Sequence, residues 1–112
     1  NIKRGEIWVI NLGNPKGSGQ GYTRPCIVIS NNHNNRYSTE LQVVAITSVN
    51  KKDLPVHLKM KQGKFGLHDN SIILGETIQQ VNKSQFKYYM DKLDDETMKL
   101  VERRIKIQLA LV

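Results

Sequence analysis

The sequence predicts a mainly β protein with helical additions: a small, twisted and mostly antiparallel sheet or open barrel, followed by a C-terminal helix. Short apolar segments with two-residue alternation or β-branched composition occur along the chain as far as Val81. One pattern with helical periodicity then closes the chain, and several short strands followed by a helix favour this class. Because 112 residues match the usual size of one domain, we expect residues 1–112 to form a single domain.

The first part of the chain alternates strands with polar connections. A strand is expected over Glu6–Leu12, where apolar side chains fall on both faces, as in a sheet that is buried between layers or closed on itself. Gly13–Tyr22 is rich in glycine and is predicted to be a loop whose backbone can approach a ligand closely. Cys26–Ser30 is predicted to be a short apolar strand, and Asn31–Asn35 has the composition of a turn.

The middle of the chain continues the β pattern. Leu41–Val49 is a long β-branched run, and Val56–Met60 alternates in a way that places His57 on the opposite, exposed face. A turn that contains two glycines follows, and it leads to two further predicted strands, Asn70–Leu74 and Thr77–Val81.

The end of the chain has helical signals. Ser84–Tyr89 is predicted to form a helical turn with Ser84 as its N-cap. The strongest helix begins after Asp94, with acidic residues in its first turn and basic residues late, as the helix dipole favours. We expect its apolar stripe to pack against the sheet, with part of it available for a subunit contact. The stripe comprises Met98, Val101, Ile105, Leu109 and Val112, widened by Leu100, Ile107 and Leu111.

The positive charge is concentrated in the first half of the chain. Lys and Arg number 17 and Asp and Glu 10, which gives a formal net charge of +7. Residues 1–66 carry ten basic and three acidic side chains, whereas residues 67–112 carry seven of each. Such a field attracts a polyanion such as nucleic acid or an acidic protein. The competing interpretation is a charge that serves solubility only.

Other chemistry has little support in the sequence. The single cysteine, Cys26, lies in an apolar strand as a core residue and suits a reducing cytoplasm, where we expect the protein. His33, His57 and His68 lack metal-ligand spacing, so we expect no metal and no other cofactor. Nucleotide-binding and GxSxG motifs are absent. No apolar stretch approaches the ~18 residues of a membrane span and no signal peptide is visible, so we expect no membrane association.

The glycine-rich loop and the residues after it can bind a phosphate. Glycines expose backbone N–H groups, Ser18 and Gln20 add side-chain donors, and Arg24 supplies a planar cation before a strand anchored by Pro25. On the residues alone, a flexible hairpin loop with an Arg tethered to a carboxylate explains the pattern equally well.

This loop, with the strand that follows it, resembles the start of the MazF/PemK family of toxins from bacterial toxin–antitoxin systems. The resemblance covers essentially the whole chain, in order and with near-family spacing. The matching segments are Arg4–Trp8, Gly17–Asn31, Asn35–Ser38, Ala45–Ser48, Leu54–His57, Asp69–Glu76 and Leu93–Glu96 with the final helix.

The resemblance implies an SH3-like small β-barrel with a C-terminal helix, and a homodimer. It implies a sequence-specific, metal-independent endoribonuclease that cleaves single-stranded RNA, held inactive by an acidic MazE-like antitoxin. Promoter DNA, bound together with the antitoxin, is a secondary expectation. The residues at the family's catalytic positions are Arg24 and Thr47. The residues expected to bind the substrate are Ser18, Gln20, Ser48, Leu54, Glu76 and Thr77.

Two positions depart from the family pattern. Many relatives have Glu between the Ser and the Gln of the loop, where this chain has Gly19. The loss of that carboxylate removes a candidate proton acceptor or base-reading group, which predicts a changed cleavage sequence or a lower rate. Thr77, where some relatives carry Gln, also predicts altered base recognition.

For such a ribonuclease, the 2′-hydroxyl of the RNA is the nucleophile, and attack leaves a cyclic phosphate and a free 5′-hydroxyl. We expect Arg24 to stabilise the charge on the phosphoryl oxygens, and Thr47 either to donate a hydrogen bond to the same group or to orient the attacking 2′-hydroxyl. Because arginine does not give up its proton, the general base stays unassigned, with His57 as an alternative proton shuttle.

Two rival functions remain open at this point. One is a non-enzymatic toxin of the CcdB type, which inhibits DNA gyrase by binding it. The other is an RNA-binding module that has lost catalysis together with the loop carboxylate. The Arg24–Pro25 pair and Thr47 favour the ribonuclease over the gyrase binder, because a gyrase binder needs no phosphate-binding cation beside a hydroxyl.

Overall fold

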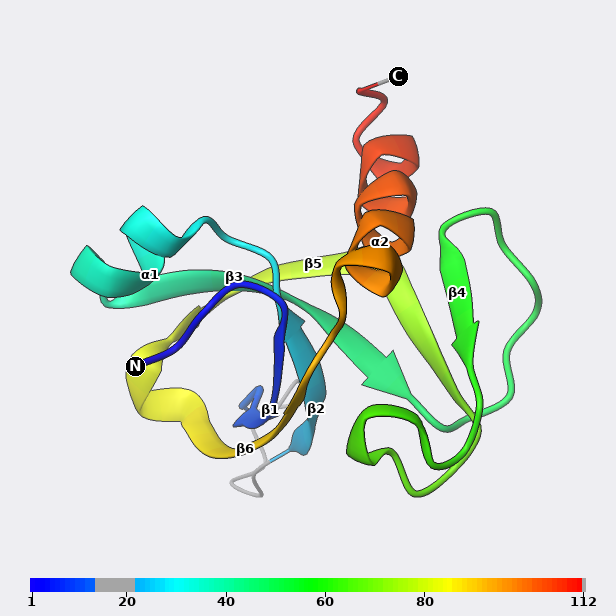
Figure 1. Cartoon of the computed structure of the whole chain (residues 1–112), viewed down its shortest axis with the longest axis horizontal. Helices are drawn as coiled ribbons and strands as arrows, with labels where there is room; N and C mark the ends of the chain where they lie inside the picture. Colours follow the sequence, from blue (N-terminus) through cyan, green and yellow to red (C-terminus); the bar gives the residue numbers. More distant parts are fainter. Residues whose placement is uncertain (14–21, 112) are drawn as a thin grey trace.

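Six antiparallel strands form one sheet in this computed structural model, which describes residues 1–13 and 22–111 (Figure 1). The sheet order is β4-β5-β3-β2-β1-β6. The strands are β1 Glu6–Asn11, β2 Thr23–Val28, β3 Glu40–Thr47, β4 His57–Met60, β5 Ser71–Asn82 and β6 Phe86–Lys92. The helical elements are α1 Asn32–Tyr37, the short 3₁₀ turns η1 Lys64–Gly66 and η2 Lys83–Gln85, and α2 Asp95–Gln108.

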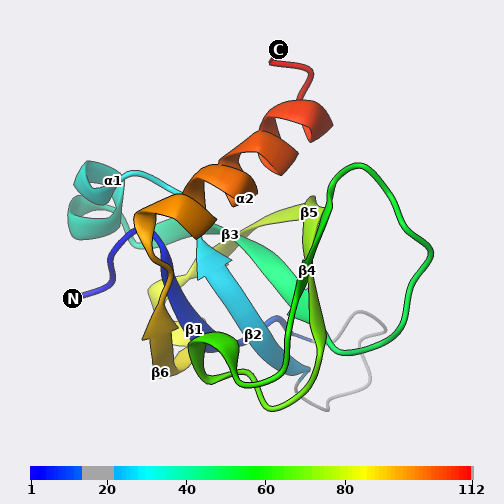
Figure 2. The same cartoon turned by 45° about the vertical axis from the view of Figure 1, so that its right-hand side comes forward.

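The sheet buries apolar side chains on both of its faces. Ile7 and Ile27 belong to one core cluster, which α2 closes with Met98 and Val101. Ile10 belongs to the second cluster, on the other face. The helix packs against β5 and β4 (Figure 2). The two-sided apolar pattern of the first strand therefore predicted this arrangement correctly. The sheet is open between its edge strands β4 and β6, as in an open, barrel-like fold.

The two strands expected near residues 70–81 are one continuous strand, β5. Its long pairing with β3 contains a bulge between Val44 and Ile46. The Thr77 hydroxyl bonds to the backbone at this bulge. Its Oγ1 accepts a hydrogen bond from the Ala45 N–H at 3.0 Å and donates to the Leu74 carbonyl at 2.9 Å. The bulge lets the strand bend without breaking, which sequence alternation alone does not reveal.

Two predicted turns have a different structure. The segment after Asn31 is the short helix α1, capped by the Asn31 side chain, which accepts from the Asn34 N–H at 2.8 Å. The prediction of a helical turn over Ser84–Tyr89 is wrong for most of that segment. The turn η2 is capped by Asn82, and the chain then enters β6, which pairs with β1.

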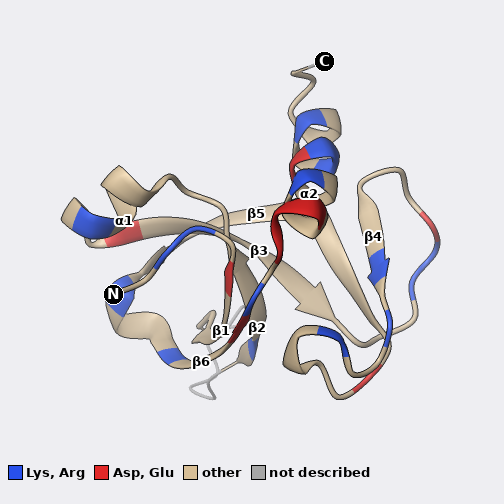
Figure 3. Cartoon of the chain, in the orientation of Figure 1, with Lys and Arg blue, Asp and Glu red and all other residues tan. Residues whose placement is uncertain are grey.

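The C-terminal helix begins as predicted. The Asp94 carboxylate accepts a hydrogen bond from the Thr97 N–H at 2.7 Å, and this bond holds the pKa of Asp94 below its ordinary value. Figure 3 shows acidic residues at the first turn of α2 and basic residues farther along it. The end of the apolar stripe is exposed at Ile107, Leu109 and Leu111. No described helix is long and apolar enough to cross a membrane.

Candidate functional site

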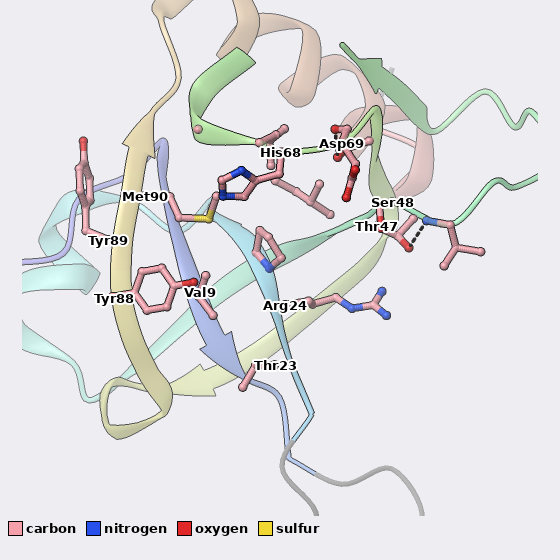
Figure 4. Close-up of a pocket in the computed structure, with 16 residues that line it drawn as sticks. Val9, Thr23, Arg24, Thr47, Ser48, His68, Asp69, Tyr88, Tyr89 and Met90 are labelled. Carbon is pink, nitrogen blue, oxygen red and sulfur yellow. Dashed lines mark hydrogen bonds between the residues drawn. The ribbon is translucent and has the colours of Figure 1, made fainter. Parts of the chain in front are cut away.

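Strands β2 and β3 bring Arg24 and Thr47 together. Their antiparallel register pairs Cys26 with Ala45, and Arg24 and Thr47 each lie two residues from that pair, at the same end of the two strands. Both residues line one open pocket with a volume of about 530 Å³ (Figure 4). The two residues predicted to be catalytic therefore share a cavity large enough for a nucleotide.

The Arg24 guanidinium is available to a ligand from this pocket. Its Cζ lies 4.6 Å from the centroid of the Tyr22 ring, so the cation packs on an aromatic face. Among the described residues, the ion pairs join Arg4 to Glu102, His57 to Glu76 and Lys59 to Asp53, and none includes Arg24.

The Thr47 hydroxyl is oriented by the backbone. Thr47 is only 4 % exposed, and its Oγ1 accepts a hydrogen bond from the Val49 N–H at 3.2 Å. Because the oxygen is occupied as an acceptor on that side, its hydrogen is left to donate elsewhere. Ser48 follows Thr47, is exposed and lines the same pocket. This corner of the pocket thus offers hydroxyl groups beside a guanidinium.

The opposite side of the pocket comes from two other parts of the chain. His68 and Asp69 lie between η1 and β5, and Tyr88 and Met90 lie on β6. Figure 4 shows Tyr88, Met90 and His68 across the view from Arg24, Thr47 and Ser48, with Asp69 nearer to Ser48. Sequence reasoning missed this wall, because the predicted helical turn hid the strand that carries Tyr88.

The other residues expected to bind substrate have different positions. Ser18 and Gln20 lie outside the described residues. Leu54 is exposed in the connection between β3 and β4, and neither it nor Glu76 nor Thr77 is among the residues that line the pocket. The Thr77 hydroxyl is engaged inside the sheet, as described above. Roles for these five residues in RNA binding remain predictions.

His57 is buried, and its predicted exposure is wrong. The residue is 9 % exposed, and its Nε2 lies 2.8 Å from Oε2 of Glu76 on the neighbouring strand β5. The adjoining backbone is packed closely: a Cβ on Gly75 would lie 2.6 Å from the Val56 carbonyl oxygen and 3.1 Å from Cβ of Arg104 on α2. His57 does not line the pocket, so this pair is part of the packing between β4, β5 and α2.

Cys26 is a core residue, as the sequence predicts. It is completely buried in the second core cluster. Burial raises the pKa of its thiol to about 12, against a smaller opposite effect from Arg24. A thiol that stays protonated is a poor nucleophile. No cluster of three His, Cys, Asp or Glu side chains suited to a metal ion occurs in the described part of the chain.

The fold and the sequence both match known toxins. Residues 3–109 match the family model described as the PemK-like, MazF-like toxin of type II toxin–antitoxin systems. The chain therefore belongs to this toxin family. It is 36% identical over 111 residues to the endoribonuclease MazF of Staphylococcus saprophyticus subsp. saprophyticus, covering 98% of this chain and 92% of that protein.

Solved structures agree with this fold. An endoribonuclease in complex with its cognate antitoxin, from a Mycobacterial species, superposes with a TM-score of 0.82 at 20% identity and covers 100% of this chain and 98% of its own. MazF from Deinococcus radiodurans gives a TM-score of 0.79 at 18% identity, with 97% and 96% of the two chains covered. The small barrel-like fold with a C-terminal helix is thus confirmed.

Proposed function

We propose that this toxin is an endoribonuclease that cleaves single-stranded RNA at specific sequences within the pocket of Arg24 and Thr47. The observation that carries the proposal is the placement of a guanidinium without an ion pair, among the described residues, beside a pre-oriented hydroxyl in one open cavity. The 36% identity to a MazF endoribonuclease over nearly the full chain supports the same activity. The excess of basic residues suits a polyanionic substrate.

The chemistry follows from the substrate. The 2′-oxygen of RNA attacks the adjacent phosphorus and gives up its proton, and the bond from phosphorus to the 5′-oxygen breaks. The products are a cyclic phosphate and a 5′-hydroxyl, which takes up a proton. Negative charge grows on the phosphoryl oxygens during this step. Arg24 stabilises that charge through its N–H donors, and Thr47 donates its hydroxyl hydrogen to the same group.

Neither a metal nor a protein nucleophile is required by this reaction, because the nucleophile belongs to the substrate and the cation is Arg24. Arginine keeps its proton in proteins, so another group must accept the proton of the 2′-hydroxyl. His57, the alternative shuttle, is buried against Glu76 away from the pocket lining. His68 borders the pocket and is exposed, and histidine is the side chain that most often exchanges protons near neutral pH. We therefore assign proton acceptance to His68.

RNA selection is assigned to residues around this pocket. Ser48 lines the pocket directly. The glycine-rich segment that contains Ser18 and Gln20 precedes β2 in the sequence. Leu54, Glu76 and Thr77 are the further candidates from the family positions. Gly19 and Thr77 predict a cleavage sequence that differs from that of relatives with Glu and Gln there.

The toxin works as a homodimer and is held inactive by an acidic MazE-like antitoxin. The formal net charge of +7 favours an acidic partner. The similar Mycobacterial endoribonuclease is described in complex with its cognate antitoxin. Binding of promoter DNA is proposed for the toxin–antitoxin complex rather than for the toxin alone.

The test is to incubate the purified chain with one long single-stranded RNA in EDTA and to map the ends of every fragment. We expect discrete fragments that share a short sequence at the cut, with a cyclic phosphate on one end and a 5′-hydroxyl on the other. Uncleaved RNA at every enzyme concentration would overturn the proposal. Tight RNA binding without cleavage would favour the RNA-binding module, and inhibition of DNA gyrase without cleavage would favour a toxin of the CcdB type.

A further inference from the structure

An exposed tyrosine, Tyr88, stands on the wall of the pocket opposite Thr47. It projects from β6, lines the same cavity as Arg24 and is 60% exposed. We propose that Tyr88 is a stacking surface for a base of the RNA strand that binds in this pocket. The inference rests on the proposed ribonuclease function and adds a binding residue that acts on a base rather than on the phosphate.

Tyr88 and Arg24 lie two strands apart and line the same pocket. Val9 on β1 pairs with Tyr88 on one side and with Pro25 on the other. Tyr88, Val9 and Pro25 therefore form one row across three neighbouring strands, and Pro25 directly follows Arg24. Strands two apart are separated by roughly 10 Å. Arg24 pairs with Ile10, so its side chain starts from the other face of the sheet, but it lines the same cavity; an RNA strand bound by Arg24 therefore has Tyr88 on the far wall of that cavity.

The adjacent tyrosine has a different environment. Tyr89 borders the pocket, but Figure 4 shows its ring on the far side of β6, whereas the Tyr88 ring extends from β6 toward Val9. Tyr89 packs edge to face on Trp8, with ring centroids 5.7 Å apart and an interplanar angle of 77°. Among the described residues, Tyr88 takes part in no comparable aromatic pair. Packing therefore accounts for Tyr89 and leaves the Tyr88 ring available to a ligand.

An exposed aromatic ring beside a phosphate-binding cation suits single-stranded RNA. Unpaired bases are splayed out and stack on aromatic side chains, which a duplex does not permit. Stacking tolerates any base, because every base has a π face. Arg24 would bind the phosphate and Tyr88 a base, so the RNA strand would be held at two points of the pocket.

The first test compares Tyr88→Ala with Tyr88→Phe and with Tyr37→Ala. Tyr37 is the matched control, because it is a more exposed tyrosine on α1 and does not line the pocket. We expect Tyr88→Ala to raise KM for a short RNA about 5- to 100-fold, the range of one lost base stack, with little change in kcat. Tyr88→Phe keeps the ring and should bind like the wild type, as should Tyr37→Ala.

The second test identifies the base. Each nucleotide near the cleavage site is replaced in turn by an abasic ribose, which keeps its 2′-hydroxyl, and binding is measured with a 2′-deoxy substitution at the cut. At one position, loss of the base should weaken wild-type binding as much as Tyr88→Ala does. The two losses should not add at that position, because they remove the same contact.

Full additivity at every position would overturn the inference, and so would unchanged RNA affinity of Tyr88→Ala. A variant that lost affinity only for an acidic antitoxin peptide would place the antitoxin, and not RNA, on Tyr88. These results are distinguishable from failure of the proposed function, because in each of them the wild type still cleaves RNA.

Discussion

Two polar pairs in this toxin, both built across neighbouring strands, have opposite environments. Arg24 and Thr47 lie where β2 and β3 meet an open pocket, and Arg24 forms none of the ion pairs of the described residues. His57 and Glu76 lie on β4 and β5, bonded to each other beneath α2. The first pair keeps donors available to a ligand, whereas the second pair joins His57 Nε2 to Glu76 Oε2 inside the fold and leaves His57 Nδ1 and Glu76 Oε1 buried without a partner among the described residues. Polar residues of similar type thus serve function in one place and stability in the other.

A large loss of cleavage is expected on substitution of Thr47, at the pocket. Thr47→Val keeps the shape of the side chain and removes its hydroxyl donor, so kcat should fall about 10²–10³-fold. Thr47→Ser keeps the donor and should lose far less. Single-turnover cleavage of a defined RNA checks both variants, and a Thr47→Val enzyme as fast as the wild type would remove the hydroxyl from the mechanism.

Gly75 tests the packing around the other pair. A Cβ at this position would meet the Val56 carbonyl oxygen at 2.6 Å and Cβ of Arg104 at 3.1 Å. Because a backbone carbonyl cannot move aside as a side chain can, Gly75→Ala should lower the free energy of unfolding by about 1–3 kcal/mol. Urea denaturation measures the change. Unaltered stability would show that α2 and β5 are packed less closely here than the structure indicates.

Glu76 decides whether the second pair serves stability or RNA binding. Glu76→Ala leaves the buried His57 ring without its partner, which should cost about 1–3 kcal/mol of stability. Glu76→Gln retains an oxygen at the same place and should cost less. Once folded, both variants keep the wild-type KM for RNA if the pair serves packing alone. A raised KM at unchanged stability would instead support the RNA-binding role expected from the family position.

The smallest effect is expected at Asp94, which is remote from both pairs. The Thr97 N–H lowers the pKa of this carboxyl group, so its charged form stabilises the start of α2. This contribution is present above the ordinary pKa of 3.8 and is lost as the pH falls through the lower pKa of the folded state. Asp94→Ala should therefore lower Tm at pH 7, and the difference from the wild type should shrink in acid. An equal Tm at pH 7 would contradict the capping role.

Features of this fold that depend on local sequence signals could be predicted, whereas those that depend on strand pairing could not. The two-sided apolar pattern of β1 and the cap at Asp94 are local signals, and both were confirmed. Arg24 and Thr47 were identified through family resemblance, and their alignment depends on the register of β2 and β3. The burial of His57 could not be predicted, because its partner Glu76 is 19 residues away and reaches it only through the pairing of β4 with β5.

The pocket wall on β6 shows a further limit of sequence reasoning. A serine before polar and aromatic residues suggested a helical turn at Ser84. In the structure, Asn82 forms a capping box with Gln85, and the pairing of β6 with β1 converts the following residues into a strand. Tertiary pairing thus overrides the local helical signal, and it brings Tyr88 to the pocket.

The most direct measurement is the single-turnover cleavage rate of Arg24→Ala at saturating enzyme, beside the rate of Arg36→Ala. Arg36 is an exposed arginine on α1 that does not line the pocket. With folding and RNA binding verified for both proteins, Arg24→Ala should be slower than the wild type by about 10²–10³-fold, and Arg36→Ala should be unchanged. Wild-type cleavage by Arg24→Ala would contradict the central claim that this guanidinium stabilises the reacting phosphate.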